Sequence, residues 1–161
     1  MIASGHWPVL AALLALHILS VVFWIGGMGF VTVIVLPALT RLPPGRRFPA
    51  FQELERRFAR VAQILVILTG ASGGALIARL HLQPLLDRTA GLWLDGMIAF
   101  WSFFVLLLFV LEPLVLHRRL AAQAQRDEPR VLTRLGRAHV ILLILAVVVI
   151  AAAVLGAEGA A

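Results

Sequence analysis

A single uncharged stretch, from Val9 to Leu39, does most to limit what this chain can fold into. It holds no arginine, lysine, aspartate or glutamate. As a helix rising ~1.5 Å per residue, it is long enough to cross a hydrocarbon core ~30 Å thick. One imidazole, that of His17, lies deep inside it, and such a group in an apolar span indicates a functional site by default. We therefore expect a membrane-spanning helix here, with the rest of the chain packed around it.

The composition is typical of a polytopic membrane protein. Hydrophobic residues make up 61% of the 161 residues, which is more than a soluble domain of this size carries. The absence of cysteine excludes disulfides, thiolate-held clusters and redox thiols. A bound metal would need histidine, methionine, carboxylate or backbone oxygen ligands. The net charge of +6 comes from residues that flank apolar spans, so we expect the lipid bilayer, and no nucleic acid, as the partner.

Three further apolar stretches predict three more spanning helices. The expected helices cover about residues 9–39, 50–80, 92–117 and 130–155. The polar segment 118–130 is expected to be the third loop. Within it, Asp127 and Glu128 before Pro129 are typical of a helix start. The prediction is an all-α fold, an integral membrane four-helix bundle that forms a single transmembrane domain over residues 1–161.

The arginines predict the orientation of the bundle. Six lie in or beside the first loop, two beside the second, and six in or beside the third: Arg41, Arg46, Arg47, Arg56, Arg57, Arg60; Arg79, Arg88; Arg118, Arg119, Arg126, Arg130, Arg134, Arg137. Short arginine-rich loops stay in the cytoplasm, which places both termini on the outer (periplasmic) side. We therefore expect a multi-pass protein of a bacterial-type inner (cytoplasmic) membrane.

Two groups of polar side chains emerge when depth is counted along the helices. At ~1.5 Å per residue, His17 lies about 7 Å, and Met97 about 10 Å, to the outer side of the midplane. Asp95 lies slightly further out. These residues predict an outer, membrane-embedded site, although methionine is also a common core filler.

The second group lies at the cytoplasmic interface and contains Glu112, His117 and His139. Both histidines are candidate metal ligands, against the simpler interpretation that they contact water or headgroups. Glu112 could instead pair with an arginine of a neighbouring helix.

His17 needs an internal partner, which can be a hydrogen bond, a metal ion or a haem iron. A bundle of four apolar helices can hold a flat macrocycle with one axial imidazole. Candidate lining residues are two tryptophans, two glycines that would leave room for a ring, and an arginine within reach of haem propionates: Trp24 and Trp101, Gly26 and Gly27, and Arg60 or Arg137. Glycine-rich helices also simply pack closely, and this is the favoured interpretation of the Gly70–Gly74 pair.

The first helix also carries a family resemblance. Its residues 16–39, LHILSVVFWIGGMGFVTVIVLPAL, resemble the opening helix of small membrane proteins of the copper-resistance CopD type and of the related HemJ-type protoporphyrinogen oxidases. Those proteins share a histidine, six or seven further residues, then a tryptophan and a pair of small residues. Here these are His17, Trp24, Gly26 and Gly27. The later helices are similar to theirs too, so the resemblance covers nearly the whole chain and implies a haem-associated role for His17.

The third helix departs from the HemJ pattern. HemJ-type proteins have a histidine and a lysine after the tryptophan of that helix, whereas this chain has Asp95 and Met97 and no lysine. The resemblance therefore implies a haem-binding or copper-handling relative more than an orthodox HemJ oxidase. A methionine axial ligand would raise the reduction potential of a haem.

Three functions follow as hypotheses. The first is a b-type haem protein that oxidises a porphyrin-like or quinone-like substrate, or relays electrons to a membrane redox partner, with His17 and Met97 as axial ligands. The second is a copper-handling transporter, because histidine and methionine suit copper. The third is a cofactor-free structural subunit of a membrane complex. The oligomeric state, including a homo-oligomer, stays open at this stage.

Overall fold

A computed structural model describes residues 6–86 and 88–159 and confirms the all-α bundle. The elements in chain order are α1 (His6–Phe30), the π-helix η1 (Val31–Val35), α2 (Leu36–Leu39), α3 (Arg47–Arg79), the 3-10 turns η2 (Gln83–Leu85) and η3 (Thr89–Gly91), α4 (Leu92–Leu106), the π-helix η4 (Leu107–Leu116) and α5 (His117–Gly159). No strand occurs in these two ranges.

Within these ranges, four helical stretches are long and apolar enough to cross a membrane. They are Trp7–Leu39, Arg47–Arg79, Thr89–Leu114 and Glu128–Ala157. Only 6–28% of the most apolar window in each is buried inside the protein. Large apolar side chains such as Phe23, Ile67 and Leu155 face outward. Because a face this apolar is stable only against hydrocarbon, the bilayer is the environment of this chain.

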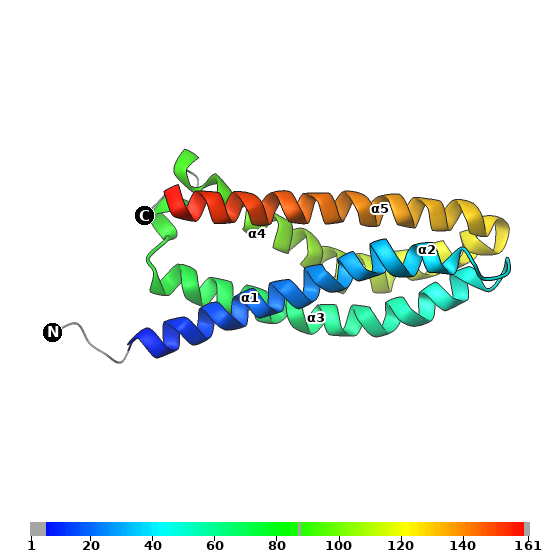
Figure 1. The fold of residues 1–161 in the computed structure, drawn as a ribbon, viewed down its shortest axis with the longest axis horizontal. Helices are drawn as coiled ribbons and strands as arrows, with labels where there is room; N and C mark the ends of the chain where they lie inside the picture. The colour runs from blue at the N-terminus through cyan, green and yellow to red at the C-terminus, as the bar shows by residue number, and fades with distance from the viewer. Residues whose placement is uncertain (1–5, 87, 160–161) are drawn as a thin grey trace.

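The predicted third loop, over residues 118–130, is wrong. Residues 117–126 form a helix that continues from η4, and only Asp127 leaves helical geometry, with φ −153° and ψ 76°. At Asp127 the chain reverses, so the first arm of α5 (117–126) runs antiparallel to its second arm (128–159) (Figure 1). Polarity does not end a helix, and a segment rich in Ala, Gln, Arg and Leu favours one.

The predicted helix start at this reversal is confirmed. The Asp127 Oδ1 accepts a hydrogen bond from the Arg130 backbone N–H at 3.1 Å. Pro129 lies in the first turn, where its missing N–H leaves no helical bond unmade. A single capping residue therefore makes the turn between two long helices.

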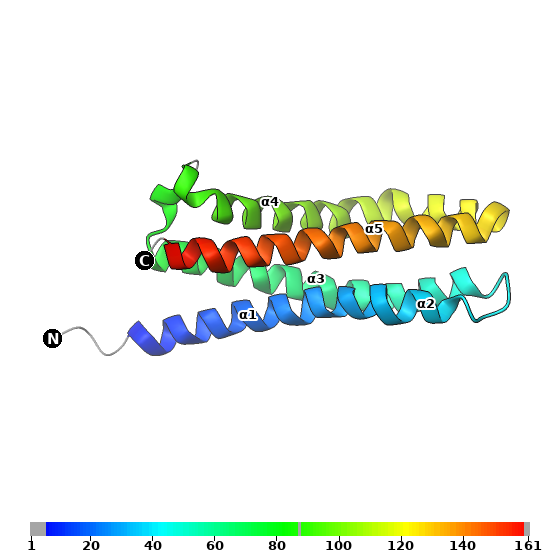
Figure 2. The same cartoon turned by 45° about the horizontal axis from the view of Figure 1, so that its top comes forward.

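The helices form two closely packed pairs, α1 with α3 and α4 with α5 (Figures 1 and 2). The start of α1, the end of α5 and the α3–α4 connection lie at one end of the bundle, the termini end. The loop 40–46 and the reversal at Asp127 lie at the other, the hairpin end.

Two clusters of buried residues hold the bundle together. The central cluster draws on all four spans and contains Trp24, Ile25, Met28, Ala62, Val66, Phe104 and Ala146. The hairpin-end cluster contains Val31, Leu39, Phe48, Phe51 and Val131, with Leu120, Ala121 and Ala124 of the first arm packed against it. This packing is the tertiary reason that the first arm is ordered as a helix.

The hairpin end is fixed by one buried carboxylate. Glu128 is 8% exposed, and its two oxygens accept hydrogen bonds from the backbone N–H groups of Gly45, at 2.6 Å, and Phe48, at 2.8 Å. Gly45 has φ +83°, a conformation that other residues rarely adopt. Glu128 thereby ties the first loop and the start of α3 to α5.

Proline shapes the second half of the α4 span. In a π-helix, the Leu108 carbonyl would bond to the N–H of residue 113, but Pro113 has none. The missing donor is supplied by Gln63 of α3, whose Nε2 donates a hydrogen bond to the Leu108 carbonyl at 3.1 Å. A polar side chain in a membrane helix thus satisfies a carbonyl that the proline would leave without a partner.

Candidate functional site

The His17 ring lies against α3 and is half-buried. Its Nδ1 is 3.1 Å from the Thr69 carbonyl oxygen and 3.2 Å from the Ser72 Oγ. The Ser72 hydroxyl donates its own hydrogen to the Leu68 carbonyl at 2.6 Å. Two acceptors therefore face Nδ1.

This arrangement decides where the imidazole carries its proton. A carbonyl oxygen can only accept, so Nδ1 is the protonated nitrogen of the neutral ring, and Nε2 keeps its lone pair. No hydrogen bond to Nε2 occurs within the part of the chain that the structure describes. The ring is thus oriented by α3 while its other nitrogen stays available as a ligand.

Small residues on α3 make the close approach of the ring possible. A Cβ added at Gly73 would lie 3.0 Å from the His17 Cε1. Thr69, Ser72 and Gly73 were not singled out from the sequence as site residues. The available signal was their arrangement: small and weakly polar residues at helical spacing inside an otherwise apolar helix.

Thr69, whose carbonyl faces the His17 ring, also carries a buried hydroxyl. Its Oγ1 makes no hydrogen bond to any described residue. Such a hydroxyl can still donate to an acceptor that reaches it. A free lone pair and an unused hydroxyl on adjacent helices fit a ligand that binds through a metal and carries polar edges.

Met97 lies on α4 and is half-buried, as is Asp95 in the first turn of the same helix. No hydrogen bond or ring contact joins either residue to His17 within the described ranges. The predicted outer site is therefore built from α1 and α3, with Met97 on a helix of the opposite pair.

The other predicted lining residues lie elsewhere. Trp24 is buried in the central cluster, edge-to-face with Phe104 at a centroid distance of 4.9 Å. Gly27 packs beneath the Phe58 ring, and Gly26 is exposed on the outer face of α1. At ~1.5 Å per residue, Trp24 lies about 10 Å along α1 from His17. Its role in the structure is packing in the central cluster.

Arg60 is exposed on α3. It precedes Thr69 by nine residues on α3, ~13 Å along the helix, and it makes no ion pair among the described residues. No hydrogen bond joins Arg60 to the His17 ring within the described ranges.

Of the second predicted group, the structure describes the side chains of Glu112 and His139. The His139 Nδ1 donates to the Leu135 carbonyl of its own helix at 2.9 Å, and its ring meets Phe51 edge-to-face. The His117 side chain lies outside the described part. No group of three His, Cys, Asp or Glu side chains suited to a metal ion occurs among the described residues.

Glu112 pairs with an acid where the sequence suggested an arginine. Its carboxyl is hydrogen-bonded to the carboxyl of Glu55 on α3. A hydrogen bond between two carboxyl groups requires that one of them keep its proton. Sequence spacing offers no signal for this contact, because Glu55 and Glu112 belong to different helices.

The Gly70–Gly74 pair behaves differently from a helix-packing motif. The Trp101 ring packs against Gly70, and its Nε1–H donates a hydrogen bond to the Val66 carbonyl at 2.8 Å. A Cβ added at Gly74 would meet no described atom within 4 Å. Among the described residues, Gly70 is therefore the member of the pair that meets another helix.

Comparisons with protein-family models, with curated proteins and with solved structures gave no match. The resemblance to the CopD and HemJ types therefore stays a prediction from the sequence.

Proposed function

We propose that this protein binds a b-type haem within the membrane and has a redox role, with His17 as an axial ligand through Nε2. One observation carries the proposal: the Nδ1–H of His17 is held by the Thr69 carbonyl, which fixes the ring and leaves the Nε2 lone pair free. A hydrogen bond from the non-ligating nitrogen to a carbonyl is the arrangement that orients metal-bound histidines and raises their basicity.

Each residue around the ring has a role in this proposal. Ser72 gives Nδ1 a second acceptor and so limits rotation of the ring. Thr69 supplies an unused buried hydroxyl for a polar edge of the bound group. Met97, on α4, would be the candidate for a second iron ligand, and a thioether there would favour the reduced iron. A bound haem would supply one-electron transfer, to a quinone-like or porphyrin-like substrate or to a membrane redox partner.

A cofactor-free structural role is the competing function, and a specific observation favours it. Nδ1 already has two acceptors on α3, so the imidazole is satisfied without a metal. In that case His17 would serve only to join α1 to α3, and the protein would act through its exposed apolar faces, as a subunit of a larger membrane complex.

The absorption spectrum of the detergent-purified protein separates these functions. We expect a Soret band in the wild type from a haem-replete host, and its loss or shift in His17→Ala. His139→Ala is the matched control, because it removes another membrane-helix imidazole whose Nδ1 is also bonded to a carbonyl. The control should keep the band.

Elemental analysis of the same samples completes the test. Iron near one equivalent supports the haem proposal, whereas copper without a Soret band supports the copper-handling alternative. A colourless protein without iron or copper contradicts both and supports the structural role.

We further propose that both termini face the periplasm of a bacterial-type cytoplasmic membrane. The arginine-rich loop 40–46 and the first arm of α5 lie at the same end of the bundle (Figure 1). Arginine-rich connections at a common end support a cytoplasmic position for that end.

A further inference from the structure

A hollow of about 220 Å³ lies at the hairpin end, across the reversal of α5. It is lined by Gln123, Arg126, Asp127, Arg130, Val131 and Arg134. Both arms contribute, because Gln123 and Arg126 precede the reversal while the last three residues follow it. The hollow therefore exists only because the helix reverses at Asp127.

Three arginines line this hollow with a single carboxylate, that of Asp127. Arg126, Arg130 and Arg134 are exposed, and none of them forms an ion pair with a described residue. Asp127 is the carboxylate among the lining residues, and its Oδ1 is occupied by the Arg130 N–H as a helix cap.

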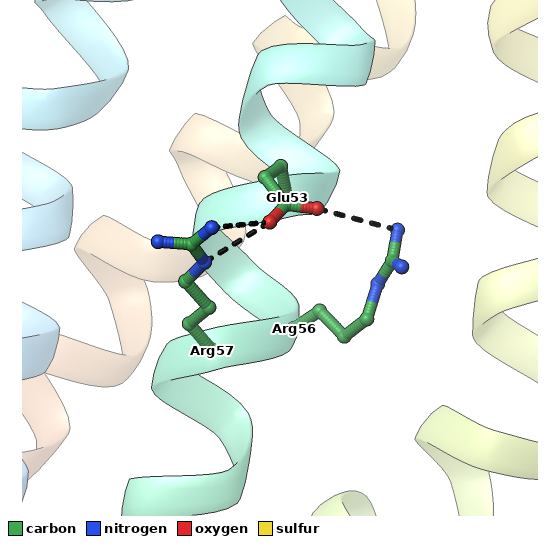
Figure 3. Close-up of polar contacts among 3 residues, drawn as sticks. All are labelled: Glu53, Arg56 and Arg57. Atoms are coloured by element: carbon green, nitrogen blue, oxygen red, sulfur yellow. Dashed lines mark hydrogen bonds and ion pairs between the residues drawn. The ribbon is translucent and has the colours of Figure 1, made fainter.

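A different arginine pair shows what compensation looks like in this protein. Figure 3 shows Glu53 of α3 between Arg56 and Arg57, with N–O distances of 3.8 and 2.9 Å. The single carboxylate of Glu53 thus offsets one of these two positive charges within the same helix. The hollow has three arginines to one aspartate, and none of the three forms such an ion pair with a described residue, so an anion from outside would lower their mutual repulsion.

The hollow also lies at a defined depth. The uninterrupted apolar part of the second arm begins at Val140, six residues after Arg134, which is ~9 Å along a helix. The headgroup region extends several ångströms beyond each side of the hydrocarbon core. Arg134 therefore lies at the outer edge of the headgroup region, from which its long side chain can reach lipid phosphates, and Arg126 and Arg130 lie further from the hydrocarbon.

We propose that this hollow is a binding site for the phosphate group of an anionic phospholipid. Guanidinium groups bind phosphate oxygens through two parallel N–H donors. The hollow is large enough for a phosphate group with several waters, since one water occupies ~30 Å³ of liquid. The α5 reversal thus anchors the hairpin end to one lipid headgroup, independently of any cofactor at His17.

Lipid retention by the full-length protein tests the proposal. The detergent-purified protein is incubated with phosphatidylglycerol or phosphatidylcholine, and retained lipid is counted by native mass spectrometry. We expect the wild type to retain phosphatidylglycerol in preference to phosphatidylcholine. The triple variant Arg126→Gln/Arg130→Gln/Arg134→Gln should lose this preference, by about fivefold for each arginine removed.

A charge-matched variant separates a built site from general attraction. Arg41→Gln/Arg46→Gln/Arg119→Gln removes three exposed arginines outside the hollow, and both triple variants lower the net charge from +6 to +3. The control should keep the preference. An equal loss in both variants overturns the proposal, because it shows attraction without a site.

Two further measurements make the result decisive. Inorganic phosphate added at constant ionic strength distinguishes the source: displacement of the lipid identifies free phosphate as the ligand, and persistence identifies the lipid headgroup. Circular dichroism checks that the triple variant is folded, and the single variant Arg126→Gln replaces it if it is not. Unchanged retention in folded variants also overturns the proposal.

Discussion

At the scale of single residues, Gly70 and Gly74 lie one turn apart on α3 and have opposite surroundings. The Trp101 ring packs on Gly70, whereas a side chain at Gly74 has open space among the described residues. The same residue type therefore does two things: one glycine admits a ring between helices, and the other faces outward.

Substitution at these glycines should separate the two roles. Gly70→Val would collide with the Trp101 ring and break its bond to the Val66 carbonyl, so we expect the free energy of unfolding to fall by ~1–3 kcal/mol. Gly74→Val is the matched control and should change it by less than ~0.5 kcal/mol. Unfolding in mixed micelles of detergent and dodecyl sulfate measures both. Equal losses would show that the ring contact is not what requires Gly70.

At the scale of elements, η4 shows how a membrane helix tolerates proline. Pro113 removes the donor that the Leu108 carbonyl needs, and α3 supplies one through Gln63. The tolerance therefore lies in the pairing of two helices, because neither sequence alone satisfies the carbonyl.

A double-mutant cycle tests this pairing. Gln63→Leu should lower the free energy of unfolding by ~1–3 kcal/mol, because a carbonyl is left unsatisfied. In a Pro113→Ala background the alanine N–H can bond to Leu108, so the same substitution should cost ~1 kcal/mol less. Gln125→Leu, at an exposed position of the first arm, is the surface control. Strict additivity in the cycle would show that Gln63 does not serve Pro113.

At the scale of the whole molecule, Glu128 and the hairpin-end cluster join both polar connections at the same end. The result is a bundle with one arginine-rich end and one end that carries the termini. Because the arginines gather at one end of the bundle axis, the proposed topology has that end in the cytoplasm.

Cysteine labelling tests that orientation, and the chain is suited to it because it has no cysteine of its own. Gln83→Cys, near the termini end, and Gln125→Cys, near the hairpin end, are both at exposed positions. A membrane-impermeant maleimide added to intact spheroplasts should label Cys at position 83 and should label position 125 only after lysis. The reverse pattern would place the termini in the cytoplasm and contradict the proposed topology.

The sequence was sufficient for those features that depend on neighbours in the chain. The length of the apolar runs determined four spans and the all-α class, because a backbone in hydrocarbon must satisfy its own hydrogen bonds. The same kind of local information marked the helix start at Asp127. The sequence-based prediction of a loop was wrong for residues 118–126, because polar composition alone does not distinguish a loop from an exposed helix that packs on one face.

The partners of the buried polar groups were decided only by the tertiary structure. Depth along a helix showed that His17 needs a partner, but the choice of Thr69 and Ser72 depends on which face of α3 meets α1. The same holds for Gln63 with Leu108, and for Glu55 with Glu112. These pairs lie far apart in the chain, and helical periodicity orders residues within one helix while carrying no information on the rotation of one helix against another.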